Sequence, residues 1–350
     1  MINRIKCFAP VPVSEWGLFK NFRIIEGISI LFLICSLAGC LSGCTKNTAP
    51  LSKTDFVMDT VATITIFDGP DESGGEELLN ESFNEIRRYE RLFSAEIPDS
   101  DVSRINRSRG ERVDINFETA ELLKTALRYC ELSDGAFDIT IRPVSKLWDF
   151  KSGQCRIPDE SSISEALKHV GYENIILDEV EYAVSLKDPD SEIDLGAVAK
   201  GYTADRIKEY LLDRGVTSAI INLGGNVLLI GSKRDGSPFK IGIEKPFSKE
   251  GEMIKTLSEK DVSIVTSGNY ERCFEKDGKL YHHILDTETG YPVESGLNAV
   301  TIVSGKSVDG DALSTICFCL GKERAEELLN RLDGEDTKSY YINDKNELLF

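Results

Sequence analysis

The alternation of hydrophobic and polar positions divides the chain into short strands and amphipathic helices. In residues 56–67, FVMDTVATITIF, β-branched and apolar residues alternate with polar ones, which predicts the first strand. Apolar side chains three and four residues apart predict helices over 76–93 and 117–133. Further strand-like runs occupy 174–186, 218–230, 239–244, 262–266, 279–285 and 297–303.

Two more helices are predicted over 203–213 and 309–332, the second interrupted by Gly321. Several strand-like runs follow one another without a helix between them, which favours an α+β fold with mixed or antiparallel sheets and flanking helices. No internal repeat is found, so we expect one domain over residues 54–350, with the possibility of two lobes.

The N-terminus has the pattern of an export signal. Basic residues precede the apolar run ISILFLICSLAG at 28–39, which is too short to span a bilayer as a helix. The run ends in LAGC at Cys40, which resembles a bacterial lipobox, and a similar LSGC ends at Cys44. We therefore expect a lipoprotein signal peptide over 1–39 and a lipidated tether over 40–53; a plain secretory signal and lipidation at Cys44 remain alternatives.

Charge and cysteine content exclude several classes of function. The net charge of −18 argues against a nucleic-acid partner. A negatively charged ligand would need a local positive group or a metal ion. The nine cysteines form no CxxC pair and no Cys/His cluster, so neither a zinc site nor a thioredoxin-like motif is supported.

The stretch IDLGAVAKGYTADR, residues 193–206, places an acid, small residues and Lys200 just before a helix. Such a stretch suits a phosphate with its metal ion, although an ordinary strand-to-helix turn also explains it. Asp311 and Thr315 stand at positions i and i+4 of a helix and can present oxygen ligands suited to Mg²⁺ on one face. The alternative for this pair is a helix cap with a solvated acid.

Seven motifs in order resemble those of the ApbE family, the FAD:protein FMN transferases. They are MDT, GAFDIT, DLGAVAKGY, NLGGN, TSGNYER, HHILDTETGYP and DALST. The resemblance implies an ApbE-like fold with an FAD cleft between two lobes. It also implies that FAD is cleaved with the help of Mg²⁺, that FMN passes to a Ser or Thr hydroxyl of a target protein, and that AMP leaves.

The same resemblance implies roles for individual residues. The metal ligands would be the Ala197 carbonyl, Asp311 and Thr315. The FAD contacts would be Met58, Ala136, Phe137, Asp138, Asp194, Lys200 and Leu285. Glu96 stands where family members often have an aromatic residue, so no ring-stacking role is expected there.

The acceptor hydroxyl needs a base, and His283 is the candidate because imidazole titrates near neutral pH. Asp286 would orient His283 or replace it, and the alternative is that His283 only orders its loop. The resemblance implies that the partner is a membrane-bound or secreted redox protein with an Asp-Gly-x-Ser/Thr-Gly-Ala/Ser-Ser/Thr motif. We expect the enzyme to be lipid-anchored on the extracytoplasmic face of the cell membrane.

Two other functions remain open on the sequence alone. An FAD pyrophosphatase would use water in place of the protein hydroxyl and release free FMN and AMP. A non-catalytic flavin-binding lipoprotein of the cell envelope would hold FAD without cleaving it. It would not require Asp311 and Thr315 as metal ligands.

Overall fold

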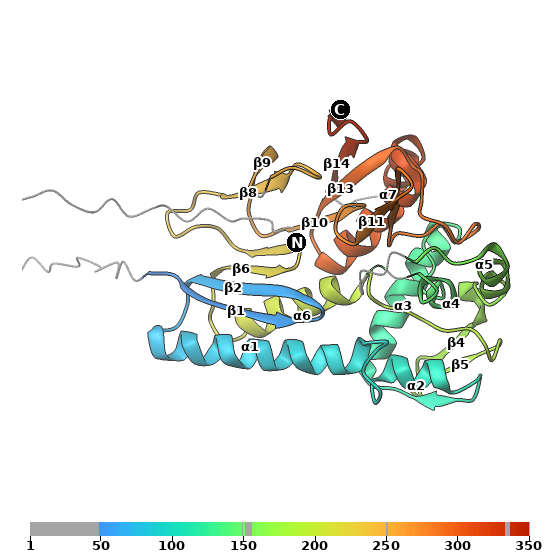
Figure 1. Ribbon diagram of the computed structural model, residues 1–350. Helices are drawn as coiled ribbons and strands as arrows, with labels where there is room; N and C mark the ends of the chain where they lie inside the picture. Colours follow the sequence, from blue (N-terminus) through green and yellow to red (C-terminus); the bar gives the residue numbers. More distant parts are fainter. Residues whose placement is uncertain (1–48, 149, 151–155, 250, 333–336, 350) are drawn as a thin grey trace, which may run out of the picture. The chain divides into compact units, whose positions relative to one another are not determined.

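An eight-stranded antiparallel sheet is the largest sheet of the computed structural model, which describes residues 49–148, 150, 156–249, 251–332 and 337–349. Its strand order is β1-β2-β6-β7-β10-β13-β14-β15 (Figure 1). The strands are β1 (Leu51–Val57), β2 (Thr60–Asp68), β6 (Ser218–Leu223), β7 (Asn226–Ile230), β10 (Ser263–Gly268), β13 (Leu297–Ser304), β14 (Lys338–Asn343) and β15 (Leu348–Leu349).

Three smaller sheets complete the described strands, and these ladders are antiparallel as well. They contain β3 (Val113–Asp114), β5 (Ala183–Leu186) and β4 (Ile175–Asp178); β8 (Phe239–Glu244) and β9 (Met253–Glu259); and β11 (Cys273–Lys276) and β12 (Lys279–His282). The predicted α+β class with antiparallel sheets is thus confirmed.

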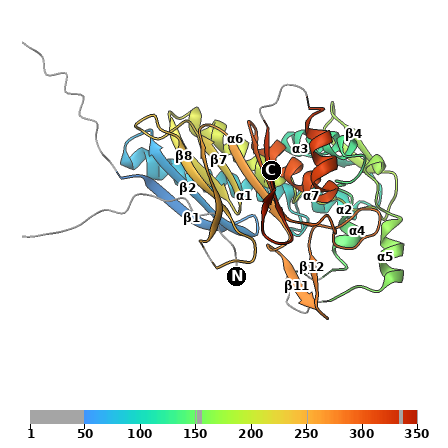
Figure 2. The same cartoon turned by 90° about the horizontal axis from the view of Figure 1, so that it is seen from above.

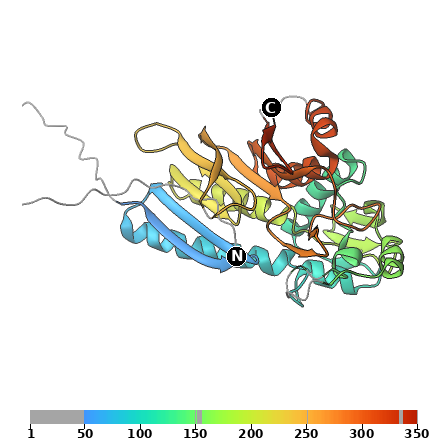
Figure 3. The ribbon, with the colours of Figure 1, turned by 45° about the horizontal axis from the view of Figure 1, so that its top comes forward.

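Helices cover the main sheet because their apolar faces match its buried positions. The helices are α1 (Glu72–Phe93), α2 (Asp101–Arg107), α3 (Phe117–Leu132), α4 (Arg142–Ser145), α5 (Glu160–Leu167), the short 3₁₀ helix η1 (Tyr172–Asn174), α6 (Ala199–Leu212) and α7 (Ser307–Leu329). Asp71 caps α1 by accepting a hydrogen bond from the Gly74 N–H (2.9 Å). Helices α1 and α6 lie beside strands of this sheet (Figures 1 and 3). Their buried side chains form one hydrophobic cluster with those of β1, β2 and β6.

The hairpin β11–β12 packs away from the main sheet (Figure 2). Its Phe274 and Tyr281 join a separate hydrophobic cluster with Trp148, which follows α4, and with Ile163 of α5. The described residues from Pro50 onward nevertheless belong to one compact unit. The domain boundary at residue 54 stays a prediction. An FAD cleft between two lobes stays a prediction.

Three predicted strands are hairpins in the structure. The run 56–67 turns at Met58 and Asp59, whose φ angles are 51° and 59°. The run 174–186 divides into β4 and β5, and 218–230 divides at Gly224 and Gly225. Non-glycine residues with positive φ are uncommon, so alternation alone did not reveal the first two turns.

Several boundaries also differ from the prediction. Strand β1 begins at Leu51, inside the segment expected to be a tether, because residues 51–57 pair with 60–66 of β2. Helix α6 begins at Ala199, four residues earlier than predicted, so Lys200 lies in its first turn. The break predicted at Gly321 is confirmed, since its φ of 72° is non-helical.

Helices α6 and α7 pack unusually closely where α7 begins. A Cβ on residue 201 would overlap the carbonyl oxygen of Ser307 and lie 2.6 Å from the Cα of Val308. Asp205, one turn further along α6, accepts hydrogen bonds from the N–H groups of Ser307 (2.8 Å) and Val308 (2.9 Å). These N–H groups lack helical partners at the start of α7, so Asp205 of α6 serves as its cap.

We predict that Gly201→Ala lowers the free energy of unfolding by about 1–3 kcal/mol, because the added methyl group must push α6 away from α7. Chemical denaturation monitored by circular dichroism measures the loss. Gly305→Ala is the matched control: it lies two residues before α7 and has open space around its Cβ position. Equal stabilities of the two variants would contradict the close packing.

Candidate active site

Asp311 is the centre of the polar groups at the α6–α7 contact. Its side chain is 4% exposed, and its two oxygens accept hydrogen bonds from the Gly201 N–H (2.5 Å) and from Nδ2 of Asn226 (3.1 Å). The nearest cation, Nζ of Lys200, lies 3.9 Å away. Burial raises the pKa of Asp311, and the charge of Lys200 opposes this rise only in part.

Thr315 lies one helical turn after Asp311, as the spacing predicted. Its Oγ1 is 3.3 Å from the Asp311 carbonyl and 3.2 Å from Oγ of Ser267 on β10. Ala197 lies in the turn that leads into α6, three residues before Lys200. The structure thus brings Lys200, Asp311 and Thr315 together.

These residues fit a magnesium ion. Asp311 is a buried carboxylate whose charge is only partly compensated, and each of its oxygens has a further lone pair beyond the hydrogen bond that it accepts. The carboxylate of Asp311 and the hydroxyl of Thr315, with the Ala197 carbonyl that the family resemblance implies, make a donor set of oxygen atoms only, which Mg²⁺ prefers.

Asn226 is a site residue that the sequence reasoning missed. It is fully buried, donates to Asp311, and accepts a hydrogen bond from the Ser307 hydroxyl (2.7 Å). The two glycines before it make the tight β6–β7 turn with φ angles of 59° and 93°. A Cβ on residue 224 would overlap the Thr60 side chain, so this turn packs closely against the start of β2.

Asp194 holds the turn that precedes α6. Its N–H donates to the Ile139 carbonyl (2.7 Å), and its Oδ1 accepts from the Gly196 N–H (2.7 Å). Its Oδ2 lies 3.6 Å from Nη1 of Arg142. Asn106 of α2 pairs with both backbone groups of Ile193 (2.7 and 2.9 Å). In this structure Asp194 therefore stabilises the turn in which it lies.

Asp138 likewise has its carboxylate occupied by neighbouring residues. It accepts hydrogen bonds from the N–H (2.7 Å) and hydroxyl (2.6 Å) of Thr140 and from the Tyr172 N–H (2.8 Å), and it is 7% exposed. These contacts hold the loop together, and the contact of Asp138 with FAD stays a prediction. Phe137 is also buried, whereas Ala136 is partly exposed.

The GAFD and HHILD segments lie next to each other. The Thr287 hydroxyl donates to the Gly135 carbonyl (2.8 Å), which joins the two loops. Leu285 is buried and forms an isolated antiparallel bridge with Pro292. Residues 136–138 and Leu285, predicted separately from two motifs, are thus brought to one region.

Met58 lies in the β1–β2 turn, beside the TSGNYER segment. Its N–H donates to Oε1 of Glu90 (2.8 Å), and its neighbour Asp59 forms an ion pair with Arg272 (2.9 Å). The carbonyl of Arg272 in turn accepts the N–H of His283 (3.1 Å). This chain of contacts connects the first motif with the histidine motif.

His283 has an uncharged ring at neutral pH. Burial lowers the pKa of His283 to about 3, and the positive charges of Arg272 and Lys200 contribute. The expectation that this imidazole titrates near neutral pH is therefore wrong for the free protein. Its Nδ1 is enclosed and has no hydrogen-bond partner in the described part of the chain, which leaves a proton-accepting or proton-donating group unused.

Asp286 does not orient His283 in this structure. Its Oδ1 accepts hydrogen bonds from the N–H groups of Glu288 (3.0 Å) and Thr289 (2.7 Å), so it shapes the turn over 286–290. Among the described residues no hydrogen bond or ion pair joins it to His283. The predicted orienting contact is thus absent among the described residues, where Asp286 forms a turn, and its role as a substitute base stays a prediction.

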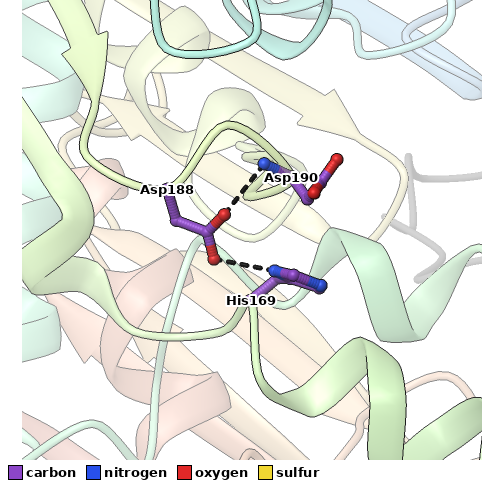
Figure 4. Close-up of side chains that lie close together, drawn as sticks. All are labelled: His169, Asp188 and Asp190. Atoms are coloured by element: carbon purple, nitrogen blue, oxygen red, sulfur yellow. Dashed lines mark hydrogen bonds and ion pairs between the residues drawn. The ribbon is translucent and has the colours of Figure 1, made fainter.

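A second polar cluster lies outside the predicted site (Figure 4). Nδ1 of His169 is 2.7 Å from Oδ2 of Asp188, whose Oδ1 accepts the Asp190 N–H (2.9 Å). Arg109 pairs with the Asp190 carboxylate (3.0 Å), and His169 and Asp190 border a cavity of about 520 Å³. The sequence reasoning did not foresee this cluster, whose members hold one another through these contacts.

Residues 58–337 match the model of the ApbE family. The chain belongs to the ApbE family. A FAD:protein FMN transferase of Klebsiella pneumoniae (strain 342) is 37% identical over 278 residues, which cover 79% of this chain and 85% of that protein. One of Treponema pallidum (strain Nichols) is 31% identical over 321 residues, with 88% of each chain covered.

Solved structures of the family have the same fold. The ApbE protein of Thermotoga maritima matches with a TM-score of 0.78 at 32% identity and covers 86% of this chain and 96% of its own. The flavin transferase ApbE of Vibrio cholerae matches with a TM-score of 0.76 at 25% identity and the same coverage. The family resemblance read from the seven motifs is confirmed.

The lowered pKa of His283 predicts an acid-dependent loss of stability. Below about pH 6.5 the unfolded chain binds a proton at this ring, whereas the folded chain stays neutral down to about pH 3. His283 therefore lowers the free energy of unfolding by up to about 1.4 kcal/mol for each pH unit as the pH falls through this window. We expect urea denaturation of wild type and His283→Asn to diverge from pH 6.5 to pH 4. Parallel stability curves would contradict the shift.

Proposed function

We propose that this chain transfers FMN from FAD to a Ser or Thr hydroxyl of a target protein and releases AMP. The observation that carries the proposal is the convergence of Lys200 and buried Asp311 at the α6–α7 contact, with Thr315 one turn away. Its relatives bear the name FAD:protein FMN transferase, which supports the same reaction.

The reaction balances with one bond formed and one broken at phosphorus. The acceptor oxygen bonds to the phosphorus of the FMN half, while the bond from that phosphorus to the bridging oxygen breaks and AMP leaves with the electron pair. The hydroxyl proton passes to the neutral ring of His283, which is in the protonation state of a base. Because a free-protein pKa of about 3 makes a weak base, we expect the negative diphosphate to raise it in the complex.

A chain of net charge −18 must compensate the charge of a diphosphate locally. Lys200, in the first turn of α6, supplies one positive charge beside Asp311. Mg²⁺, held by Asp311, Thr315 and the Ala197 carbonyl, would neutralise charge on the diphosphate oxygens as it builds up on the leaving group. Asp194 keeps the preceding turn in place.

We also propose the cellular placement inferred from the sequence. Cys40 and the signal segment lie outside the described residues, and lipidation at Cys40 would anchor the enzyme on the extracytoplasmic face of the membrane. None of the helices in the described part of the chain combines the length and apolar character needed to cross a membrane. The acceptor would be a membrane-bound or secreted redox protein with the Asp-Gly-x-Ser/Thr-Gly-Ala/Ser-Ser/Thr motif.

We predict covalent labelling of such an acceptor. The protein is mixed with FAD, Mg²⁺ and an acceptor that carries the motif with threonine at its last position. Flavin fluorescence should stay with the acceptor band on a denaturing gel, its mass should rise by one FMN ester, and AMP should appear in equal amount.

The acceptor Thr→Ala variant is the control and should remain unlabelled, because no other hydroxyl is held in line with the diphosphate. Free FMN and AMP without labelled acceptor would replace the proposal with an FAD pyrophosphatase. Bound FAD that is never cleaved would leave a flavin-binding protein.

We predict that Lys200→Ala slows labelling about 100-fold or more, because a positive charge is lost where negative charge develops. The initial rate of acceptor fluorescence measures this. Lys208→Ala is a matched control on the same helix, since Lys208 pairs with Asp261 (2.8 Å). Similar rates for the two variants would remove Lys200 from the reaction.

A further inference from the structure

Phe247 occupies a turn position that normally requires glycine. Residues 245–248 form a turn directly after β8, in which the Ser248 N–H donates to the Lys245 carbonyl (3.3 Å). Pro246 is the second residue of this turn, and Phe247, the third, has a φ of 56°. Turns with proline second and a positive φ third favour glycine or asparagine there, because a Cβ is strained in that conformation.

The strained side chain is not used to fill the core. Phe247 is 50% exposed, and its ring meets Tyr270 edge-on, with centroids 5.9 Å apart and planes at 69°. A bulky residue that is both strained and half exposed gains little from packing. Strained positions of this kind are often retained where a side chain must meet a ligand.

Two series of contacts through neighbouring residues connect the pair of rings to the candidate active site. Tyr270 precedes Glu271, whose Oε1 lies 3.7 Å from the Cβ position of Gly225, and Gly225 precedes the Asn226 that binds Asp311. The Tyr270 ring also lies against Gly268, so closely that a Cβ on residue 268 would overlap the ring.

The second series of contacts leads to Thr315, one of the two side chains proposed as metal ligands. Gly268 follows Ser267, whose hydroxyl is 3.2 Å from that of Thr315. Both series of contacts therefore connect the Phe247–Tyr270 pair with Asp311 or Thr315 through residues that are adjacent in sequence. The exposed ring of Phe247 is the outer member of this pair.

We propose that Phe247 packs against a planar ring of FAD, and this inference rests on the proposed function for its substrate. FAD carries an aromatic ring system at each end of its diphosphate. A diphosphate at Lys200 and Asp311 therefore brings one of them within reach of an aromatic side chain that borders this site. A ring held by a turn makes such a contact with little loss of side-chain entropy.

Binding of FAD, FMN and ADP to the full chain, measured by isothermal titration calorimetry, tests this proposal. We expect Phe247→Ala to weaken FAD binding about three- to tenfold, the range of a lost aromatic pair. Phe247→Tyr should restore it. If Phe247→Ala lowers the affinity for FMN, the FAD ring that contacts Phe247 is the isoalloxazine. If it lowers the affinity for ADP, that ring is the adenine.

Phe117→Ala is the matched control. Phe117 is 49% exposed and meets Tyr182 edge-on at 5.4 Å, so it resembles Phe247 in exposure and partner, and its variant should bind FAD like wild type. Equal FAD affinities of wild type and Phe247→Ala would overturn the inference alone. A wild-type chain that binds no FAD would overturn the proposed function together with it.

Thermal unfolding separates a ligand-contact role from a structural one. Phe247→Gly relieves the strain of a positive φ, so its midpoint should equal or exceed that of wild type while FAD binding weakens. A structural role predicts the opposite, a lower midpoint with unchanged affinity, and that result would contradict the proposal.

Discussion

The hydrogen bond from the Gly201 N–H to the buried carboxylate of Asp311 is the interaction on which the candidate site depends. It exists because residue 201 has no side chain, so α6 can approach the start of α7 at backbone distance. The same approach lets Asp205 cap α7, and it places Lys200 on one side of the carboxylate. One close helix crossing therefore serves packing, capping and charge placement at once.

The motifs divide their work between forming the site and holding it. Lys200 and Asp311 face one another across the helix crossing, and Asn226 fixes the carboxylate from β7. Asp138 and Asp194 instead use their carboxylates within their own loops, which keeps the loops in place. Burying these carboxylates costs free energy, which their hydrogen bonds offset. In return, the charged groups need little rearrangement when a charged substrate binds.

The sequence predicted what depends on local periodicity and missed what depends on tertiary contacts. The spacing of Asp311 and Thr315 was sufficient to place them together, because a helix fixes positions i and i+4. The turn at Met58 and Asp59 was missed because methionine rarely adopts a positive φ, and a single aspartate is only a weak signal of one. The pKa of His283 and the turn-forming role of Asp286 depend on neighbours that no spacing rule supplies.

We propose that the buried carboxylate of Asp311 binds a cation, because the neighbouring groups of the protein compensate its charge only in part. Thermal unfolding of wild type and Asp311→Asn at increasing Mg²⁺ concentration, without FAD, tests it most directly. The account predicts that the wild-type midpoint rises with Mg²⁺, equivalent to about 2.7 kcal/mol at a hundredfold excess over Kd, whereas the variant does not respond. Equal rises in both proteins would place the metal elsewhere and contradict the claim.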